Sequence, residues 1–136
     1  SINKCYADFK TEKNKIYYGL GAIKNVGFEA ISNIVAEREK NGNYKSLMNF
    51  INRVDVKDIN KLQLEGLVKS GAFDEFNTDR KKILSSIPKI IQKILMMIKE
   101  IIKKVYLITM LKKVILNTLH QKLGQKKNFY LKNLNL

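Results

Sequence analysis

The sequence predicts a mostly α-helical fold: a short N-terminal β-hairpin, then several amphipathic helices, then a long basic C-terminal helix. Apolar residues recur every three or four positions through most of the chain. Glycines and capping residues divide these stretches into segments of ordinary helix length. After Pro88, the only proline, the sequence is almost entirely Ile, Leu, Lys and Asn. We therefore expect one domain at residues 1–87 and a helical tail at residues 88–136.

The β-hairpin is expected near the N-terminus, where residues 6–10 and 15–18 flank the polar run TEKN. Short segments with aromatic and β-branched residues on both sides of a polar turn are typical of a hairpin. The N-terminal sequence SINKCYADFK has no apolar stretch after a basic start. We therefore do not expect it to act as a signal peptide.

Two helices are expected next, in GFEAISNIVAEREKNG and SLMNFINRV. Gly42 is placed at the position after the first helix, where a left-handed residue ends many helices. Ser46 is placed to cap the second helix with its hydroxyl group. The apolar residues expected to face the core are Phe28, Ile31, Ile34 and Val35 in the first helix, and Leu47, Phe50, Ile51 and Val54 in the second.

A third helix is expected in INKLQLEGLVKSG and a fourth from DRKKILSSI onward. Asp58 is a candidate cap for the third helix, which Gly71 would end. Thr78 or Asn77 is a candidate cap for the fourth. The apolar residues expected to face the core from the third helix are Ile59, Leu62, Leu64, Leu67 and Val68.

The charge of +14 favours a polyanionic partner, either nucleic acid or an anionic membrane face. Residues 1–87 carry 15 basic and 11 acidic side chains, a net charge of +4, whereas residues 88–136 carry 11 basic residues and one acid, a net charge of +10. Lysines interrupt every long apolar stretch of the tail, so a membrane-spanning helix is not expected.

Single residues exclude several kinds of chemistry. Cys5 is the only cysteine, which excludes an internal disulfide and a cysteine-based zinc site and fits a reducing cytoplasm. His120 is the only histidine, so no histidine-paired site is expected, and we expect its side chain to be exposed. No cofactor or metal is expected. The aspartates at turns, which we expect to cap helices rather than to hold a metal, are Asp55, Asp58, Asp74 and Asp79.

Two short segments share a plan of apolar residue, glycine-containing turn and new helix: AIKNVGFEAI and LVKSGAFDEF. This is the plan of a helix-hairpin-helix. A tight turn at a helix N-terminus points N–H groups outward, where they and the helix dipole accept a phosphate oxygen. Lys24 and Lys69 would add charge to the two turns. The alternative is that Gly27 and Gly71 merely end helices that pack on each other.

The segment KIYYGLGAIKNVGFEAISNIVAEREKNGNYKSLMNFINRVD, followed by INKLQLEGLVKSGAFDEF, resembles the tandem helix-hairpin-helix region of the bacterial DNA polymerase III alpha subunit family. The resemblance covers about residues 1–85. It implies a small helical domain that holds duplex DNA, with the positions matching the two hairpins at the phosphate. These are Ile23, Lys24, Asn25, Val26 and Gly27 in the first hairpin, and Lys69, Ser70, Gly71 and Ala72 in the second.

The catalytic carboxylates of that family lie in a palm domain that would precede Ser1, so we expect no enzymatic activity from this chain alone. The expected function is sequence-independent binding of duplex DNA phosphates, as a fragment of a DNA polymerase III alpha subunit involved in DNA replication. The expected partners are double-stranded DNA and other parts of such a polymerase, and not a membrane. The alternative is a stand-alone helix-hairpin-helix adaptor whose basic tail contacts a partner or another copy.

The resemblance ends near residue 90, and three interpretations of the tail are open. An AT-rich gene read out of frame would give this composition, and sequencing the locus tests that hypothesis. A partner-binding or self-associating helix is the second interpretation, and a membrane-surface helix is the third. Residues after Gln121 are expected to fray. The apolar stripe behind the last two interpretations is Ile87, Ile91, Ile94, Ile98, Ile101, Val105, Ile108 and Ile115, interrupted by Lys112.

Overall fold

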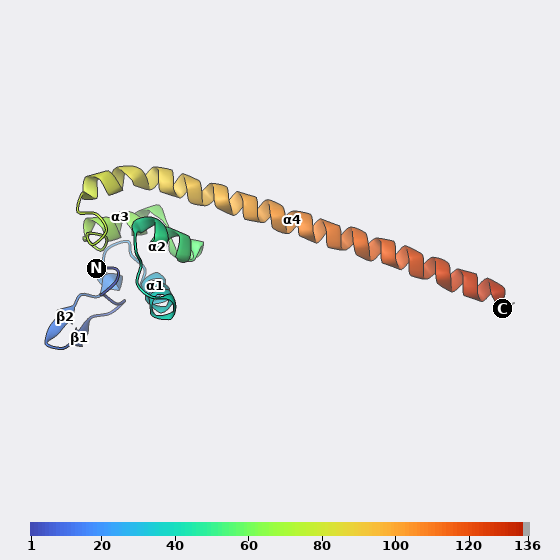
Figure 1. Ribbon diagram of the computed structural model, residues 1–136, viewed down its shortest axis with the longest axis horizontal. Helices are drawn as coiled ribbons and strands as arrows, with labels where there is room; N and C mark the ends of the chain where they lie inside the picture. Colours follow the sequence, from blue (N-terminus) through green and yellow to red (C-terminus); the bar gives the residue numbers. More distant parts are fainter. Residues whose placement is uncertain (135–136) are drawn as a thin grey trace. The chain divides into compact units, whose positions relative to one another are not determined.

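The computed structural model describes residues 1–134 and is mostly helical, as predicted. It divides into two compact units, Ser1–Ile94 and Leu95–Leu136. Figure 1 shows the helices and the small β-hairpin. The elements in order are β1 (Lys10–Glu12), β2 (Lys15–Tyr17), the 3-10 helix η1 (Leu20–Ala22), α1 (Phe28–Asn41), α2 (Leu47–Arg53), the 3-10 helix η2 (Val56–Asp58), α3 (Lys61–Lys69) and α4 (Arg80–Asn133).

The β-hairpin exists, but its first strand begins later than predicted. β1 pairs antiparallel with β2, with Lys10 opposite Tyr17, and the turn residues Lys13 and Asn14 both have positive φ. Two such residues suit a tight hairpin turn because their backbone follows the twist of the strands. The strand predicted from residue 6 is wrong there, because Tyr6 instead forms an isolated parallel bridge with Gly19.

Helix α1 confirms the predicted stop and most of the predicted stripe. Gly42 follows the helix with φ 81°, and Ile31, Ile34 and Val35 are buried. Phe28 is 58% exposed, so its predicted burial is wrong. Phe28 is the first residue of α1, and at this end of the helix the apolar face is no longer covered by the core.

The predicted N-cap of α2 is confirmed, and the predicted N-cap of α3 is wrong. The Ser46 hydroxyl accepts a hydrogen bond from the Asn49 N–H at 3.0 Å, as predicted. Helix α3 is capped by Asn60, whose side-chain oxygen accepts from the Gln63 N–H at 2.9 Å. The predicted cap Asp58 lies in η2, where it is buried and accepts a hydrogen bond from the Asn33 amide. Leu47 is only partly buried and Leu62 is exposed, whereas the other stripe residues of α2 and α3 are buried.

Helix α4 is capped by Asp79, not by Thr78 or Asn77. The Asp79 carboxylate accepts from the Lys82 N–H at 3.0 Å, while Asn77 accepts from the N–H of Asp79 itself. Each side chain thus bonds two or three residues onward, and the helix begins one residue later than predicted.

No break occurs at Pro88. Helix α4 continues through the proline, although Pro88 has no N–H to donate within the helix. Ile87 and Ile94 are buried on either side of it, so the packed face of α4 extends past the predicted domain boundary. The first unit therefore ends after Ile94 rather than after Ile87.

The second unit is a single exposed helix that reaches Asn133. The prediction of fraying after Gln121 is wrong for residues 122–133, because the helix is continuous there (Figure 1), and residues 135–136 of that prediction lie outside the described residues. His120 is exposed, as predicted. None of the helices within residues 1–134 combines the length and the low charge that a membrane-spanning segment requires.

The core of the first unit is built around aromatic rings and the N-terminal segment. Phe50 packs edge-on against both Tyr44 and Phe73, with ring centroids 5.0 Å apart in each pair. Ile2 is fully buried, and its N–H donates to the Ala72 carbonyl at 2.8 Å. The buried Arg38 guanidinium donates to the carbonyls of Ile2 and Cys5. The N-terminal residues are thereby held against the segment that follows α3.

Candidate nucleic-acid interface

The first predicted hairpin is a four-residue turn between η1 and α1. The Val26 N–H donates to the Ile23 carbonyl at 3.0 Å, and Asn25 has φ 66°. Asparagine tolerates this left-handed conformation better than most residues. Gly27, which the sequence indicates as the special turn residue, has an ordinary φ of −76°. The turn therefore depends on Asn25 and not on the glycine.

Helix α1 begins directly after this turn without a side-chain cap. Gly27 is the N-cap residue and has no side chain to accept from the helix. Its carbonyl accepts the first helical hydrogen bond, from the Ile31 N–H at 3.1 Å. The N–H groups of the first turn of a helix have no partner within the helix, and together with the helix dipole they favour an anion.

The second predicted hairpin has a different construction. Gly71 has φ 79°, its N–H donates to the Val68 carbonyl, and the Ala72 N–H donates to the Leu67 carbonyl. This pair of bonds is the Schellman arrangement that ends a helix. Its N–H groups are therefore used by the carbonyls of α3, and α4 begins only at Arg80.

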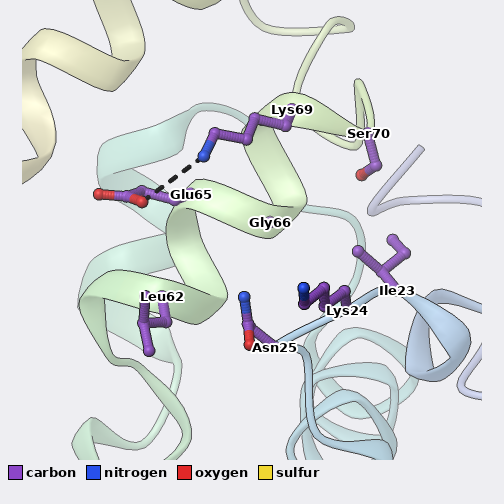
Figure 2. Close-up of a pocket in the computed structure, with 8 residues that line it drawn as sticks. All are labelled: Ile23, Lys24, Asn25, Leu62, Glu65, Gly66, Lys69 and Ser70. Atoms are coloured by element: carbon purple, nitrogen blue, oxygen red, sulfur yellow. Dashed lines mark ion pairs between the residues drawn. The ribbon is translucent and has the colours of Figure 1, made fainter.

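The two hairpins meet at one open surface pocket of about 520 Å³. Figure 2 shows the loop before α1 facing helix α3, with the residues of both hairpins at the rim. The residues lining it are Ile23, Lys24, Asn25, Leu62, Glu65, Gly66, Lys69 and Ser70.

Gly66 lets the first hairpin approach α3 closely. A Cβ atom at Gly66 would lie 2.9 Å from Val26 Cγ2 and 3.1 Å from the Lys24 carbonyl oxygen. Real Cβ atoms essentially never lie 2.9 Å from a neighbour, and 3.1 Å is tighter than nine in ten of their contacts, so this close approach favours a glycine. Sequence reasoning missed Gly66, although an isolated glycine inside a helical pattern is a signal of close packing.

The pocket carries an excess of positive charge. Glu65 is its only acidic lining residue, and it lies 3.7 Å from the Lys69 amine and 3.9 Å from the Lys61 amine. Lys24 is exposed and has no ion-pair partner within residues 1–134. The lining residues thus include two lysines and one carboxylate, a net charge of +1.

Arg80 adds a further cation beside the second hairpin, and sequence reasoning missed it too. Its guanidinium donates to the Lys69 carbonyl at 3.1 Å and forms an ion pair with Asp74. The hydrogen bonds that Arg80 donates to the Asp74 carboxylate hold the pKa of that carboxyl below its ordinary value. The sequence signal was only a basic residue at a helix start, which gives no indication of a partner six residues back.

Five of the nine predicted phosphate-binding residues line the pocket, and four do not. Ile23, Lys24, Asn25, Lys69 and Ser70 lie at its surface. The other four residues have structural roles. The side chains of Val26 and Ala72 are buried, Gly27 is the N-cap residue of α1, and Gly71 ends α3.

The carboxylates do not gather into a metal site in the described part of the chain, residues 1–134. Asp79 and Asp55 cap the starts of α4 and η2, as predicted. Asp74 and Asp58 instead bond to side chains, of Arg80 and Asn33. Cys5 is buried.

Comparison with known proteins places this geometry in context. Residues 1–83 match the family model of the helix-hairpin-helix motif. The DNA polymerase III subunit alpha of Caulobacter vibrioides is 39% identical over 85 residues, which are 62% of this chain and 7% of that protein. The Borreliella burgdorferi subunit is 43% identical over 91 residues (67% and 8%), and a Helicobacter pylori subunit is 51% identical over 85 residues (60% and 7%). The chain thus spans less than a tenth of the length of these relatives.

Proposed function

Because the chain belongs to the helix-hairpin-helix family, we propose that its first unit binds duplex DNA in replication, through phosphates and without reading base sequence. The observation that carries the proposal is the meeting of both hairpins at one basic pocket. The relatives are DNA polymerase III alpha subunits, which supports a replicative setting.

The first hairpin supplies the backbone contact. The uncapped N-terminus of α1 presents N–H groups and the positive end of the helix dipole to a phosphate oxygen. Lys24, on the turn immediately before it, is exposed and can pair with the same or an adjacent phosphate.

The second hairpin acts through side chains, since its N–H groups are bonded within the Schellman turn. Lys69 and Ser70 lie at the pocket rim opposite the first hairpin. The Ser70 hydroxyl donates to the Leu67 carbonyl at 2.9 Å, which leaves its oxygen lone pairs for water or a further donor. Lys69 is therefore the group of this hairpin that we assign to the phosphate.

None of these groups distinguishes one base from another, because phosphates are the same at every position of a duplex. Binding should therefore be sequence-tolerant. It should also weaken steeply with salt, because each phosphate contact releases a counterion from the DNA and this release is less favourable at higher salt concentration. No polymerase activity is assigned to the chain itself.

The test is a salt series of fluorescence anisotropy titrations with the full chain and two duplexes of unrelated sequence. The pocket variant is Lys24→Gln with Lys69→Gln, and the matched control is Lys122→Gln with Lys132→Gln in α4, which removes the same charge from the tail. We expect equal affinity for both duplexes. We also expect the pocket variant to lower the slope of log K against log salt by up to about 2, near 0.9 per lost phosphate contact.

The control is needed because the tail is itself strongly basic and attracts any polyanion. A pocket variant that binds like the tail control would contradict the assignment to the hairpins. A strong preference for one duplex would contradict backbone recognition.

A further inference from the structure

The part of helix α4 that lies in the second unit has a regular apolar seam whose residues are mostly exposed. From Ile98 the seam residues follow each other at spacings of 3, 4, 3, 4, 3 and 4. Ile98 is partly buried, and the apolar seam residues from Ile101 to Leu119 are about half exposed, as on an isolated helix. The seam is Ile98, Ile101, Val105, Ile108, Lys112, Ile115 and Leu119.

The period of the seam indicates the shape of what covers it. Strict alternation of three and four gives 3.5 residues per turn, whereas a straight α-helix has 3.6. A stripe with the shorter period winds slowly around the helix, and only another helix that supercoils with it can stay in contact. A flat lipid surface would instead match a stripe of period 3.6.

Five of the eight positions that flank the seam are apolar too, and the other three are Lys104, Thr109 and Thr118. In two-stranded coiled coils these flanks are usually charged, while helices inside a bundle have apolar residues there as well. The seam positions are mostly Ile or Val, which in coiled coils favours three or four strands over two. The apolar flanking residues, all about half exposed, are Leu95, Met97, Ile102, Leu111 and Leu116.

The area that the seam can bury also favours more than two helices. The 22 residues from Ile98 to Leu119 form a strip about 33 Å long and about 10 Å wide, roughly 330 Å² for one helix pair. A stable interface buries about 800 Å² on each partner. A helix with a neighbour on each flank approaches that value, whereas a single pair does not.

The charges of α4 are compatible with other copies of the same helix. Lys99, Lys103 and Lys113 lie on the side away from the seam, so packed copies keep them in water. Lys112 is the one charged seam residue. A single lysine at such a position lowers stability while it sets the register and number of strands.

We propose that α4 associates with further copies of this chain along this seam, in a bundle of more than two helices. The proposal is independent of DNA binding by the first unit. It predicts the opposite salt response: salt screens the repulsion among lysines and strengthens association, whereas it weakens phosphate contacts.

The test is sedimentation equilibrium of the full chain with two matched pairs of substitutions. The seam variant is Ile101→Asn with Ile108→Asn, and the control is Met96→Asn with Met110→Asn on the opposite side. The wild-type side chains are 56% and 53% exposed in the seam pair, and 62% and 46% exposed in the control pair. The two pairs of substitutions therefore remove a similar amount of contact within the helix itself. Only a partner packed along the seam would make their effects on association differ.

We expect three or four times the monomer mass for wild type and the control, and the monomer mass for the seam variant. Lys112→Ile should lower the dissociation constant by on the order of tenfold or more, because it completes the apolar seam. A wild-type monomer at its highest soluble concentration would overturn the proposal, as would equal loss of association in both variants. Monomers that sediment with phosphatidylserine vesicles would overturn it in favour of a lipid surface.

Discussion

Gly66 of α3 lies so close to Val26 of the first hairpin that a Cβ atom would come within 2.9 Å of the Val26 side chain. The Lys24 carbonyl oxygen is nearly as close to the same point. This contact brings the first hairpin against α3 at the pocket that Gly66 lines.

Gly66→Ala should destabilise the protein, although alanine is normally the better helix residue. In an open helix interior the change stabilises by about 0.5–1 kcal/mol. Here the added methyl group meets Val26 and the Lys24 backbone, and overpacking of this kind costs about 1–3 kcal/mol. Urea denaturation measures the difference, and DNA affinity should fall with it as the hairpin is displaced.

Gly124→Ala is the matched control for this prediction. It places the same substitution in α4, where nothing lies within 4 Å of the added Cβ atom. We expect an unchanged or slightly higher helix content by circular dichroism. If Gly66→Ala were as well tolerated as Gly124→Ala, the close approach of the hairpin to α3 would be wrong.

The two hairpin glycines should respond differently to alanine. Gly71 has φ 79°, and its added Cβ atom would lie 2.7 Å from Asp74 Oδ2 and against Arg80. Gly71→Ala should therefore cost about 1–2 kcal/mol from the left-handed backbone alone. Gly27→Ala should cost less, about 0.5–1 kcal/mol, because alanine is a poorer N-cap residue, whereas the φ of Gly27 is ordinary and its neighbours lie at 3.5 Å or beyond. Thermal melts of both variants provide the comparison, and a larger loss for Gly27→Ala would contradict it.

Tyr44 should make the protein sensitive to alkaline pH. Burial raises the pKa of its hydroxyl from 10.0 to about 12. The folded state therefore holds this proton more tightly, so the stability it provides is present below pH 10 and is lost as pH rises toward 12. The loss amounts to roughly 2 kcal/mol.

Tyr44→Phe removes this titration together with the hydrogen bond from Tyr44 to the Ile34 carbonyl at 2.7 Å. Near neutral pH we expect the variant to be less stable by about 0.5–1.5 kcal/mol. Between pH 10 and 12 the difference in the free energy of unfolding should shrink and then reverse. A difference that stays constant with pH, measured by urea denaturation, would show that Tyr44 ionises equally in both states.

The pair of Asp74 and Arg80 should make the second hairpin sensitive to acid. Hydrogen bonds from Arg80 lower the pKa of Asp74, so the stabilisation is present above the ordinary carboxyl pKa and is lost as pH falls through the lowered value. Asp74→Asn should lower the melting temperature near neutral pH and have less effect in acid. An equal decrease at every pH would mean that the substitution acts through packing rather than charge.

Local signals in the sequence predicted much of the fold. Gly42 and Ser46 act as predicted because a positive φ and an N-cap hydroxyl are requirements that few residue types meet. Phe28 could not be placed, since apolar spacing identifies a helix face but not where along the helix the core ends. The continuation of α4 through Pro88 depends on packing by Ile87 and Ile94, which outweighs the local cost of the proline.

The candidate site was partly predictable. Both hairpins were found from the spacing of glycine and lysine, and five of their residues line one pocket. The left-handed residue of the first turn was not found, because Asn25 and Gly27 both suit that conformation and the sequence does not distinguish between them. The roles of Gly66 and Arg80 depend on neighbours distant along the chain and needed the structure.

The most direct test of DNA binding at the hairpins is amide chemical-shift mapping of the full chain during a titration with short duplex DNA. We expect shifts concentrated at residues 23–30 and at Lys69 and Ser70, which reverse when salt is added. The uncapped N–H groups at the start of α1 should shift most. Shifts confined to the lysine-rich residues after Leu95, with none in the pocket, would contradict this expectation and would mean that only the charge of the tail attracts DNA.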